Sequence, residues 1–203
     1  MAGGRPRTFD ADTALDRAVD VFWRHGYEGT SVAELTATMG VNKPSLYAVF
    51  GTKEQLFFRA VQRYAERELA YFREALTQPT AIEVVSDYLD RNAAALTRSD
   101  RPAGCLSIQG GLSTSAANSA IAEFLAASRL AGEKALAERL DQARAEGDLP
   151  ADADPTALAR FVMVVSEGQA VHAAAGATHE ELHQSAAIAL GAFRCRADRL
   201  PER

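Results

Sequence analysis

Residues 31–53, SVAELTATMGVNKPSLYAVFGTK, constrain the fold of this chain more than any other stretch. The opening Ser-Val-Ala-Glu is a capping box, in which the serine hydroxyl and the glutamate carboxylate each accept from a backbone N–H group. Gly40 suits the left-handed backbone that ends a helix. Asn42 is a favourable N-cap, and Pro44 is tolerated in a first helical turn. The stretch therefore predicts two short helices joined by a tight turn.

The second of these helices has one apolar and one polar face. Leu46 and Phe50, spaced i and i+4, are expected to anchor it to a core. No Asp or Glu occurs over residues 35–53, whereas Lys43 and Lys53 are both present. A helical hairpin inside an ordinary core would show a similar turn. A locally cationic, acid-free second helix is nevertheless what a helix-turn-helix requires to enter the major groove of DNA.

The wider stretch from Phe9 to Phe58 resembles the N-terminal DNA-binding domain of the TetR/AcrR family of bacterial transcriptional regulators. The residues that carry the resemblance are Gly26-Tyr27, Thr30-Ser31-Val32, Gly40-Val41, Leu46-Tyr47, Phe50, and Lys53-Glu54 with Leu56. One departure is Pro44, where many relatives carry Gly, so the base preference of relatives cannot be transferred. The resemblance implies a dimeric regulator, most often a repressor, that binds a palindromic operator and is released by a small-molecule inducer.

Ten residues are candidates for contact with DNA. Charge and position favour phosphate contacts for Lys43 and Lys53. A short basic arm, residues 1–8, is expected to place Arg5 and Arg7 in a neighbouring minor groove, although a solubilising tail explains it equally well. The remaining candidates are Thr30 and Ser31 for phosphates, and Asn42, Pro44, Ser45 and Tyr47 on the second helix, where polar side chains face base edges.

The whole chain reads as all-α. A first helix is expected to run from Asp10 to His25, and six helices follow the helix-turn-helix: 52–76, 80–97, a short one near 103, 118–147, 155–176 and 178–194. We predict a DNA-binding domain over residues 1–51 and a helical ligand-binding and dimerisation domain over residues 52–203. The small-residue faces of the last two helices are candidates for a two-fold homodimer interface, which would require a palindromic operator.

The second half carries few clues to its ligand. Polar, sulfur and aromatic residues on otherwise apolar helices are the candidates, since ligand cavities combine apolar walls with a few polar groups. Each of them is also compatible with an ordinary core position, and a buried free cysteine is usually inert. These candidates are Cys105, Gln109, Phe124, Phe161, Met163, Glu167, Gln169 and His172.

One motif points to a different class of protein. His179-Glu180-Glu181-Leu182-His183 matches the HExxH pattern of zinc hydrolases, in which two histidines bind the metal and the glutamate is the base. A catalytic zinc needs a third ligand, and the twenty residues after the motif contain no further histidine. We therefore predict no enzyme, metal site or cofactor. A zinc hydrolase and a helical module that contacts only proteins remain as alternatives.

Composition limits the cellular setting. The net charge is −5, but residues 1–60 carry seven Lys/Arg and seven Asp/Glu, so the excess of acid lies in the remainder. A neutral domain can still bind phosphates when its cations share one face. Two cysteines make no disulfide framework, and we find neither a signal-peptide core nor a membrane span. We expect a reduced, cytoplasmic protein.

Overall fold

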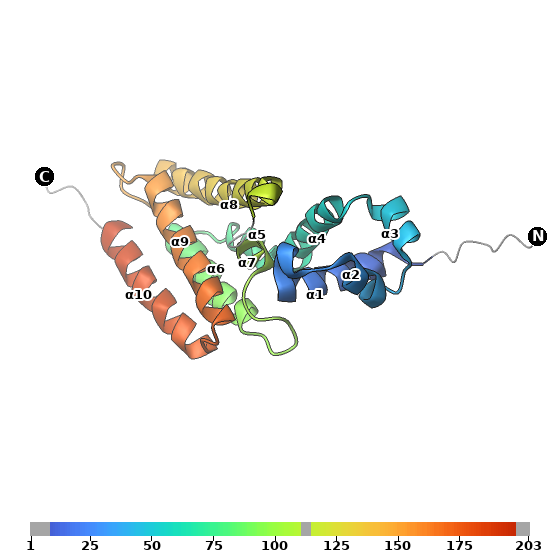
Figure 1. The fold of residues 1–203 in the computed structure, drawn as a ribbon. Helices are drawn as coiled ribbons and strands as arrows, with labels where there is room; N and C mark the ends of the chain where they lie inside the picture. The colour runs from blue at the N-terminus through green and yellow to red at the C-terminus, as the bar shows by residue number, and fades with distance from the viewer. Residues whose placement is uncertain (1–8, 111–114, 198–203) are drawn as a thin grey trace, which may run out of the picture.

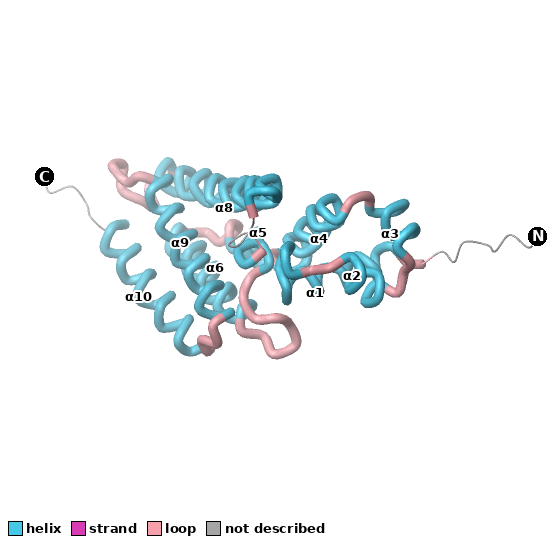
Figure 2. The backbone as a smooth tube through the Cα atoms, in the orientation of Figure 1, coloured by secondary structure: helices cyan, strands magenta, loops and turns pink. Residues whose placement is uncertain are grey.

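Helices make up all the regular structure of residues 9–110 and 115–197, which the computed structural model describes (Figures 1 and 2). These residues contain no strand, so the prediction of an all-α fold is confirmed. The helices are α1 (Ala11–Gly29), α2 (Val32–Met39), α3 (Lys43–Phe50), α4 (Lys53–Glu68), α5 (Ala70–Ala75), α6 (Ala81–Leu96), α7 (Leu106–Gln109), the 3-10 helix η1 (Ala116–Asn118), α8 (Ser119–Ala145), α9 (Pro155–Ala174) and α10 (His179–Ala197).

Helices α1 to α4 gather at one end of the molecule (Figure 1). Aromatic side chains join α1 to α4: the Phe22 and Phe57 ring centroids are 5.0 Å apart, and those of Trp23 and Tyr64 are 4.7 Å apart, both edge to face. Leu46 is completely buried and Phe50 is 3% exposed, so both anchor α3 as predicted. Buried aromatic pairs of this kind hold a small helical unit rigidly.

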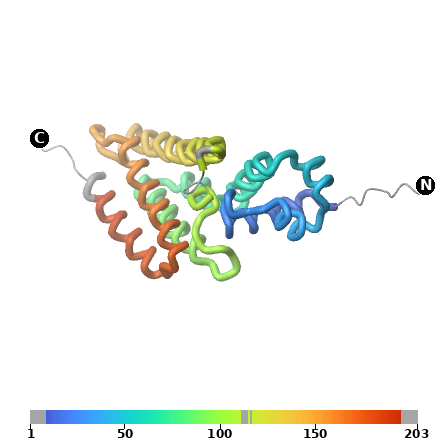
Figure 3. Tube along the Cα trace, in the orientation of Figure 1, coloured from blue at the N-terminus to red at the C-terminus, as the bar shows by residue number. Residues whose placement is uncertain are grey.

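Helices α6, α8, α9 and α10 form the other end of the molecule, as the colour order of Figure 3 makes clear. They share a core in which Leu89 of α6, Leu136 and Leu140 of α8, Val162 of α9 and Phe193 of α10 are all buried. The first core, around α1 and α4, extends through α7 to the start of α8. Helix α7 thus lies between the two ends of the fold.

Two helix boundaries differ from the sequence prediction. The predicted single helix over 52–76 is broken at Leu69 into α4 and α5, and the Arg73 guanidinium donates to the carbonyls of Ala65 and Glu66 near the end of α4. This break directs the α5 aromatics toward α6, where the Phe72 and Tyr88 ring centroids are 4.9 Å apart. The predicted end of the first helix near 25 is a kink at a positive-φ glycine, after which α1 continues to residue 29.

Side-chain caps begin both α2 and α4. The Thr52 hydroxyl and the Gln55 side chain form the reciprocal box that begins α4. Ser31 accepts from the Glu34 N–H, but the Glu34 carboxylate lies 3.3 Å from His25 Nε2 and closes no box, so that half of the prediction is wrong. None of the described helices is both long and apolar enough to cross a bilayer.

Candidate DNA-binding surface and ligand cavity

The turn between α2 and α3 has the geometry of a helix-turn-helix. Gly40 ends α2 in the left-handed region, with φ of 72°, a conformation that costs other residues more. Asn42 Oδ1 accepts from the Ser45 N–H at 2.8 Å and begins α3, with Pro44 in its first turn. Arg17 of α1 donates to the carbonyl of Met39 at 3.4 Å and holds this turn against α1.

Five of the ten predicted DNA contacts lie on α3 or at its N-cap. Asn42, Lys43 and Pro44 are exposed, Ser45 is half-buried, and Tyr47 is 41% exposed. The Lys43 ammonium lies 5.9 Å from the centroid of the Tyr47 ring, within the range of a cation–π contact. The structure therefore brings the Lys43 cation and the Tyr47 phenol together on α3, with the exposed Asn42 at its N-cap and the half-buried Ser45 in its first turn.

Lys53, at the first position of α4, is half-buried against Tyr27. Its ammonium lies 4.2 Å from the centroid of the Tyr27 ring. Partial burial lowers the pKa of Lys53, while the nearby Glu28 carboxylate acts in the opposite direction. The ring and the carboxylate thus hold a cation at the N-terminus of α4, where backbone N–H groups also favour an anion.

The remaining predicted DNA contacts lie outside α3 and α4. Thr30 is 2% exposed, and its hydroxyl donates to the carbonyl of Gly26 at 2.7 Å. Its side chain therefore stabilises the bend after the α1 kink and is turned away from any phosphate, which corrects the sequence prediction; Ser31 beside it is exposed. Arg5 and Arg7 lie outside the described residues.

Sequence reasoning missed a further cation beside α3. The guanidinium of Arg59, from α4, donates to the carbonyl of Val49 at 3.1 Å. It lies 5.9 Å from the Phe50 ring centroid and remains exposed near the end of α3. The spacing of Arg59 from Gln55 and Leu56 placed it on the outer face of its helix, which was a usable signal.

A cavity of about 100 Å³ lies among α5, α6, α7, α8 and α9. Aromatic, aliphatic and thioether groups form much of its wall, and several polar groups interrupt it. The lining residues are Leu69, Tyr71, Phe72, Tyr88, Asn92, Cys105, Ser107, Ile108, Ser128, Arg129, Gly132, Met163, Ser166, Glu167 and Ala170. A largely apolar hollow with a few polar groups is the usual form of a small-molecule site.

Most polar groups of this cavity are paired with one another. The Tyr71 hydroxyl donates to Asn92 Oδ1 at 2.8 Å, and Asn92 Nδ2 donates to Gln169 Oε1 at 2.7 Å. The Tyr88 hydroxyl donates to Ser166 Oγ at 2.9 Å, and Ser166 in turn donates to the carbonyl of Met163. This network joins α5, α6 and α9, and burial keeps the pKa of both phenols above the ordinary value.

Three of the eight predicted ligand residues line this cavity: Cys105, Met163 and Glu167. Gln169 is buried behind the wall as a partner of Asn92, and Phe124 stacks on Phe58 of α4 at 4.4 Å between centroids. Gln109 does not line this cavity. The last two predicted residues, Phe161 and His172, lie in a separate groove on the outer sides of α9 and α10, and Gln109 is not part of that groove either. The prediction thus mixed cavity, core and surface residues.

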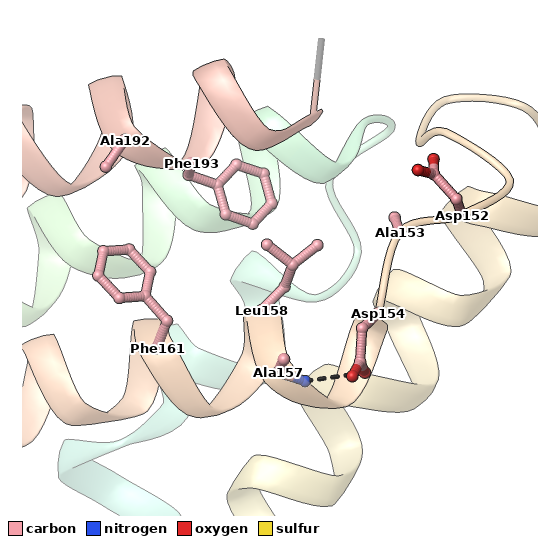
Figure 4. A pocket seen from close by; sticks show the side chains of 8 residues that line it. All are labelled: Asp152, Ala153, Asp154, Ala157, Leu158, Phe161, Ala192 and Phe193. Carbon is pink, nitrogen blue, oxygen red and sulfur yellow. Dashed lines mark hydrogen bonds between the residues drawn. The ribbon is translucent and has the colours of Figure 1, made fainter. Parts of the chain in front are cut away.

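The outer sides of α9 and α10 form an apolar groove of about 640 Å³, which includes Val164 and Ile188 at 63% and 76% exposure. A neighbouring cavity of about 340 Å³ lies between the start of α9 and the end of α10 (Figure 4). In Figure 4 the Phe161 ring rises from α9 toward α10 near Ala192, and Asp154 caps α9 by accepting from the Ala157 N–H at 3.0 Å.

Residues 104–110 connect the cavity among α5 to α9 to helix α1. Trp23 of α1 donates its indole N–H to the carbonyl of Gly104 at 3.2 Å, and the next residue, Cys105, lines the cavity. Gly104 has φ of 83°, and a Cβ there would lie 3.0 Å from the carbonyl oxygen of Ala170. The segment is therefore closely packed between α1 on one side and α9 on the other.

A second connection joins the end of α1 to the start of α8. Glu28 Oε1 accepts from the Ser115 N–H, the Ser115 hydroxyl and Asn118 Nδ2, at 2.8, 2.7 and 2.8 Å. The Asn118 amide and both Ser115 donors lower the pKa of Glu28 to about 2. A carboxylate with three donors stays ionised at neutral pH.

The HExxH segment lies at the start of α10. The His179 and His183 rings are 6.1 Å apart, and His183 Nδ1 lies 3.1 Å from Asp90 Oδ1 of α6. Glu180 accepts from Gln184 at 2.9 Å. Within residues 9–110 and 115–197, no three His, Cys, Asp or Glu side chains are arranged to hold a metal ion.

Comparison with known proteins identifies the family. The family described as bacterial regulatory proteins, tetR family, matches residues 14–60, and the tetracyclin repressor-like C-terminal domain matches residues 81–192. The chain is 37% identical over 189 residues to the HTH-type transcriptional repressor ComR of Escherichia coli (strain K12), covering 92% of this chain and 90% of ComR. It is 33% identical over 161 residues to the HTH-type regulator YezE of Bacillus subtilis (strain 168), covering 78% and 83% of the two chains.

A solved structure agrees along almost the whole chain. It contains a cysteine mutant of the TetR-family transcriptional regulator CifR complexed with 26-base-pair double-strand operator DNA. The TM-score is 0.89 at 40% sequence identity, over 93% of this chain and 99% of that one. Both halves of the fold, and not only the helix-turn-helix, are therefore shared with such regulators. The chain belongs to the TetR family of bacterial transcriptional regulators.

Proposed function

We propose that two copies of this chain bind a palindromic DNA operator and repress transcription until a small molecule releases them. The observation that carries the proposal is the exposed, acid-free face of α3, which presents Asn42, Lys43, Ser45 and Tyr47 together. Two relatives support it: ComR is a transcriptional repressor, and CifR was solved with operator DNA.

The contacts divide by chemistry. Lys43, Lys53 and the exposed hydroxyl of Ser31 are suited to phosphates, which set affinity and register. Asn42 and Tyr47 are suited to base edges in the major groove. Pro44 and Ser45 line the same surface, and Pro44 brings an apolar ring to the first turn of α3. The arm with Arg5 and Arg7 is proposed to enter the adjacent minor groove.

We place the dimer interface on α9 and α10. Four large apolar residues of these helices are exposed, and apolar groups gathered on one surface mark an association site. They are Phe161 at 39%, Val164 at 63%, Val171 at 45% and Ile188 at 76% exposure. A two-fold axis through this surface would present the two α3 helices to successive major grooves on one side of the duplex.

The cavity among α5 to α9 is the proposed inducer site. Cys105 and Ser107 of its wall follow directly on Gly104, whose carbonyl holds Trp23 of α1. A ligand that displaces this segment would therefore move α1, and with it the helix-turn-helix. By thermodynamic linkage, the operator must weaken ligand binding by the same factor by which the ligand weakens operator binding.

Each proposed domain has its own proposed function. Residues 1–51 would read DNA, and residues 52–203 would bind the ligand and the second copy. Since the proposed target is operator DNA, we also place the protein in the cytoplasm.

Selection of bound sequences from random DNA at physiological salt tests the proposal. Wild type should enrich a palindrome with half-sites about one helical turn apart or somewhat more, whereas Tyr47→Ala should enrich a different or weaker motif. Recovery of no motif, together with no change on replacing Tyr47, would contradict DNA recognition by α3.

A further inference from the structure

The inducer cavity is small. Its volume of about 100 Å³ is below the roughly 150 Å³ of an engineered protein cavity that holds benzene. Its wall includes the exposed Ser128, so the cavity is open on one side, and a single ring or a short chain can occupy it with part of the ligand in the opening. Nucleotides, peptides and multi-ring compounds exceed this space.

The walls favour an apolar body. Leu69, Phe72, Ile108, Met163 and Ala170 all face the cavity. The polar groups of Tyr71, Tyr88, Asn92 and Ser166 are already paired within the protein. A ligand rich in hydroxyl or amide groups would have to break this network or leave its own groups unpaired, and either outcome opposes binding.

One polar group of the wall has no partner. Ser107 is 6% exposed, and among the described residues its Oγ has no partner with good hydrogen-bond geometry, only a contact with the Cys105 thiol. Its neighbour Cys105 keeps a neutral thiol because burial raises the pKa of that group, and a neutral sulfur is only a weak acceptor. Buried hydroxyls are nearly always paired, so an unpaired one in a cavity wall points to a ligand atom as its partner.

The charges at the cavity compensate each other. The Arg129 guanidinium lies 4.0 Å from a Glu167 carboxylate oxygen, and Arg129 also donates to the carbonyl of Ser107 at 3.4 Å. An anionic ligand near Ser107 would meet the carboxylate of Glu167, and a cationic one would meet Arg129. The Arg129–Glu167 pair has no net charge and therefore favours neither anionic nor cationic ligands. Uncharged molecules are the class that remains.

We propose that the inducer is a small uncharged molecule with an apolar body and one oxygen that forms a hydrogen bond with Ser107 Oγ. Monocyclic and short-chain alcohols, phenols, ketones and ethers are the class that fits. This inference rests on the proposed ligand-responsive function and adds the chemistry of the ligand to it.

Phenol and toluene are the probes, because they have the same size and differ in one hydroxyl for one methyl group. Titration calorimetry on the full-length protein should show phenol binding about tenfold more tightly than toluene, the effect of one hydrogen bond. Benzoate and benzylamine, which are charged at neutral pH, should bind more weakly than phenol. In Ser107→Ala the preference for phenol over toluene should disappear, while toluene binding should be unchanged.

Ser128→Ala is the matched control, since Ser128 also lines the cavity but is exposed. It should retain the preference for phenol. Equal binding of phenol and toluene to wild type, tighter binding of benzoate, survival of the preference in Ser107→Ala, or binding of none of the four probes would each overturn the proposal. Loss of operator binding by the ligand-free protein would instead contradict the proposed function, so the two failures are distinguishable.

Discussion

Single residues decide how this protein would meet DNA. Asn42 begins α3 through its own side-chain oxygen, so its side chain is held in one orientation at the start of the proposed recognition helix. The exposure of Asn42, Lys43 and Tyr47 could be predicted from local patterns, because a cap and an i, i+4 anchor fix which side of a short helix faces outward. The burial of Thr30 could not be predicted from local patterns, because it depends on the kink at Gly26, which is a tertiary feature.

Lys43→Ala should weaken binding to every DNA sequence by a similar factor and reduce the slope of log affinity against log salt by about one, because one phosphate contact is lost. Titrations at several salt concentrations measure both effects. Lys134→Ala, an exposed lysine on α8, is the control and should leave the slope unchanged. A slope equal to that of wild type in Lys43→Ala would exclude the phosphate contact.

At the level of elements, α7 and the start of α8 are where the two ends of the fold meet. Sequence periodicity identified the helices but could not show that five of them converge on one cavity. Asn92 could have been found, since it shares a helical stripe with the buried Val85, Leu89 and Leu96. Ser107 and Arg129 could not have been identified as cavity residues from the sequence, because neither interrupts a periodic pattern.

Trp23→Phe removes the only indole donor to the buried carbonyl of Gly104 that the described residues provide. We expect a loss of about 1–3 kcal/mol in the free energy of unfolding, the cost of a buried group left unpaired. Chemical denaturation measures it. A change below about 0.5 kcal/mol, the size of an ordinary surface substitution, would show that this hydrogen bond does not join the two ends.

Glu28→Gln tests the connection from α1 to α8. The pKa of Glu28 is lowered in the folded protein to about 2, so the carboxylate stabilises the fold above its unfolded pKa of about 4.3. This stabilisation is lost as the pH falls from about 5 to about 2. Wild type should therefore have the higher melting temperature at pH 7, and the difference should vanish near pH 2.

Glu146→Gln, near the end of α8, controls for removal of one surface carboxylate. A difference between wild type and Glu28→Gln that is the same at pH 7 and near pH 2 would mean that the ionised carboxylate does not contribute through Ser115 and Asn118.

At the level of the whole molecule, the fold presents DNA-reading helices at one end and an apolar surface at the other (Figure 1). The sequence suggested a small-residue interface on the last two helices. On the predicted faces, Ala170, Ala186 and Ala189 are buried and pack α9 and α10 within one subunit, whereas Ala157, Val164, Ala174 and Ala192 are exposed. The exposed surface of these helices carries larger apolar side chains, among them Ile188.

Ile188→Asp should separate the proposed dimer, because it places a charge in the centre of an apolar interface, while the fold persists since the side chain is 76% exposed. Sedimentation velocity should show a monomer at concentrations where wild type is a dimer. Leu130→Asp, on α8 and outside the groove, is the control and should remain dimeric. A dimeric Ile188→Asp would place the interface elsewhere.

The central claim is that two α3 helices, held by one rigid dimer, read two half-sites of one operator. The most direct test is titration of the selected palindrome against a version with roughly five extra base pairs between its half-sites, which is about half a helical turn. We predict two protomers per palindrome and at least a tenfold loss of affinity for the lengthened site, since the second half-site then faces the opposite side of the duplex. Equal affinity for both DNAs, or one protomer per palindrome, would contradict the account.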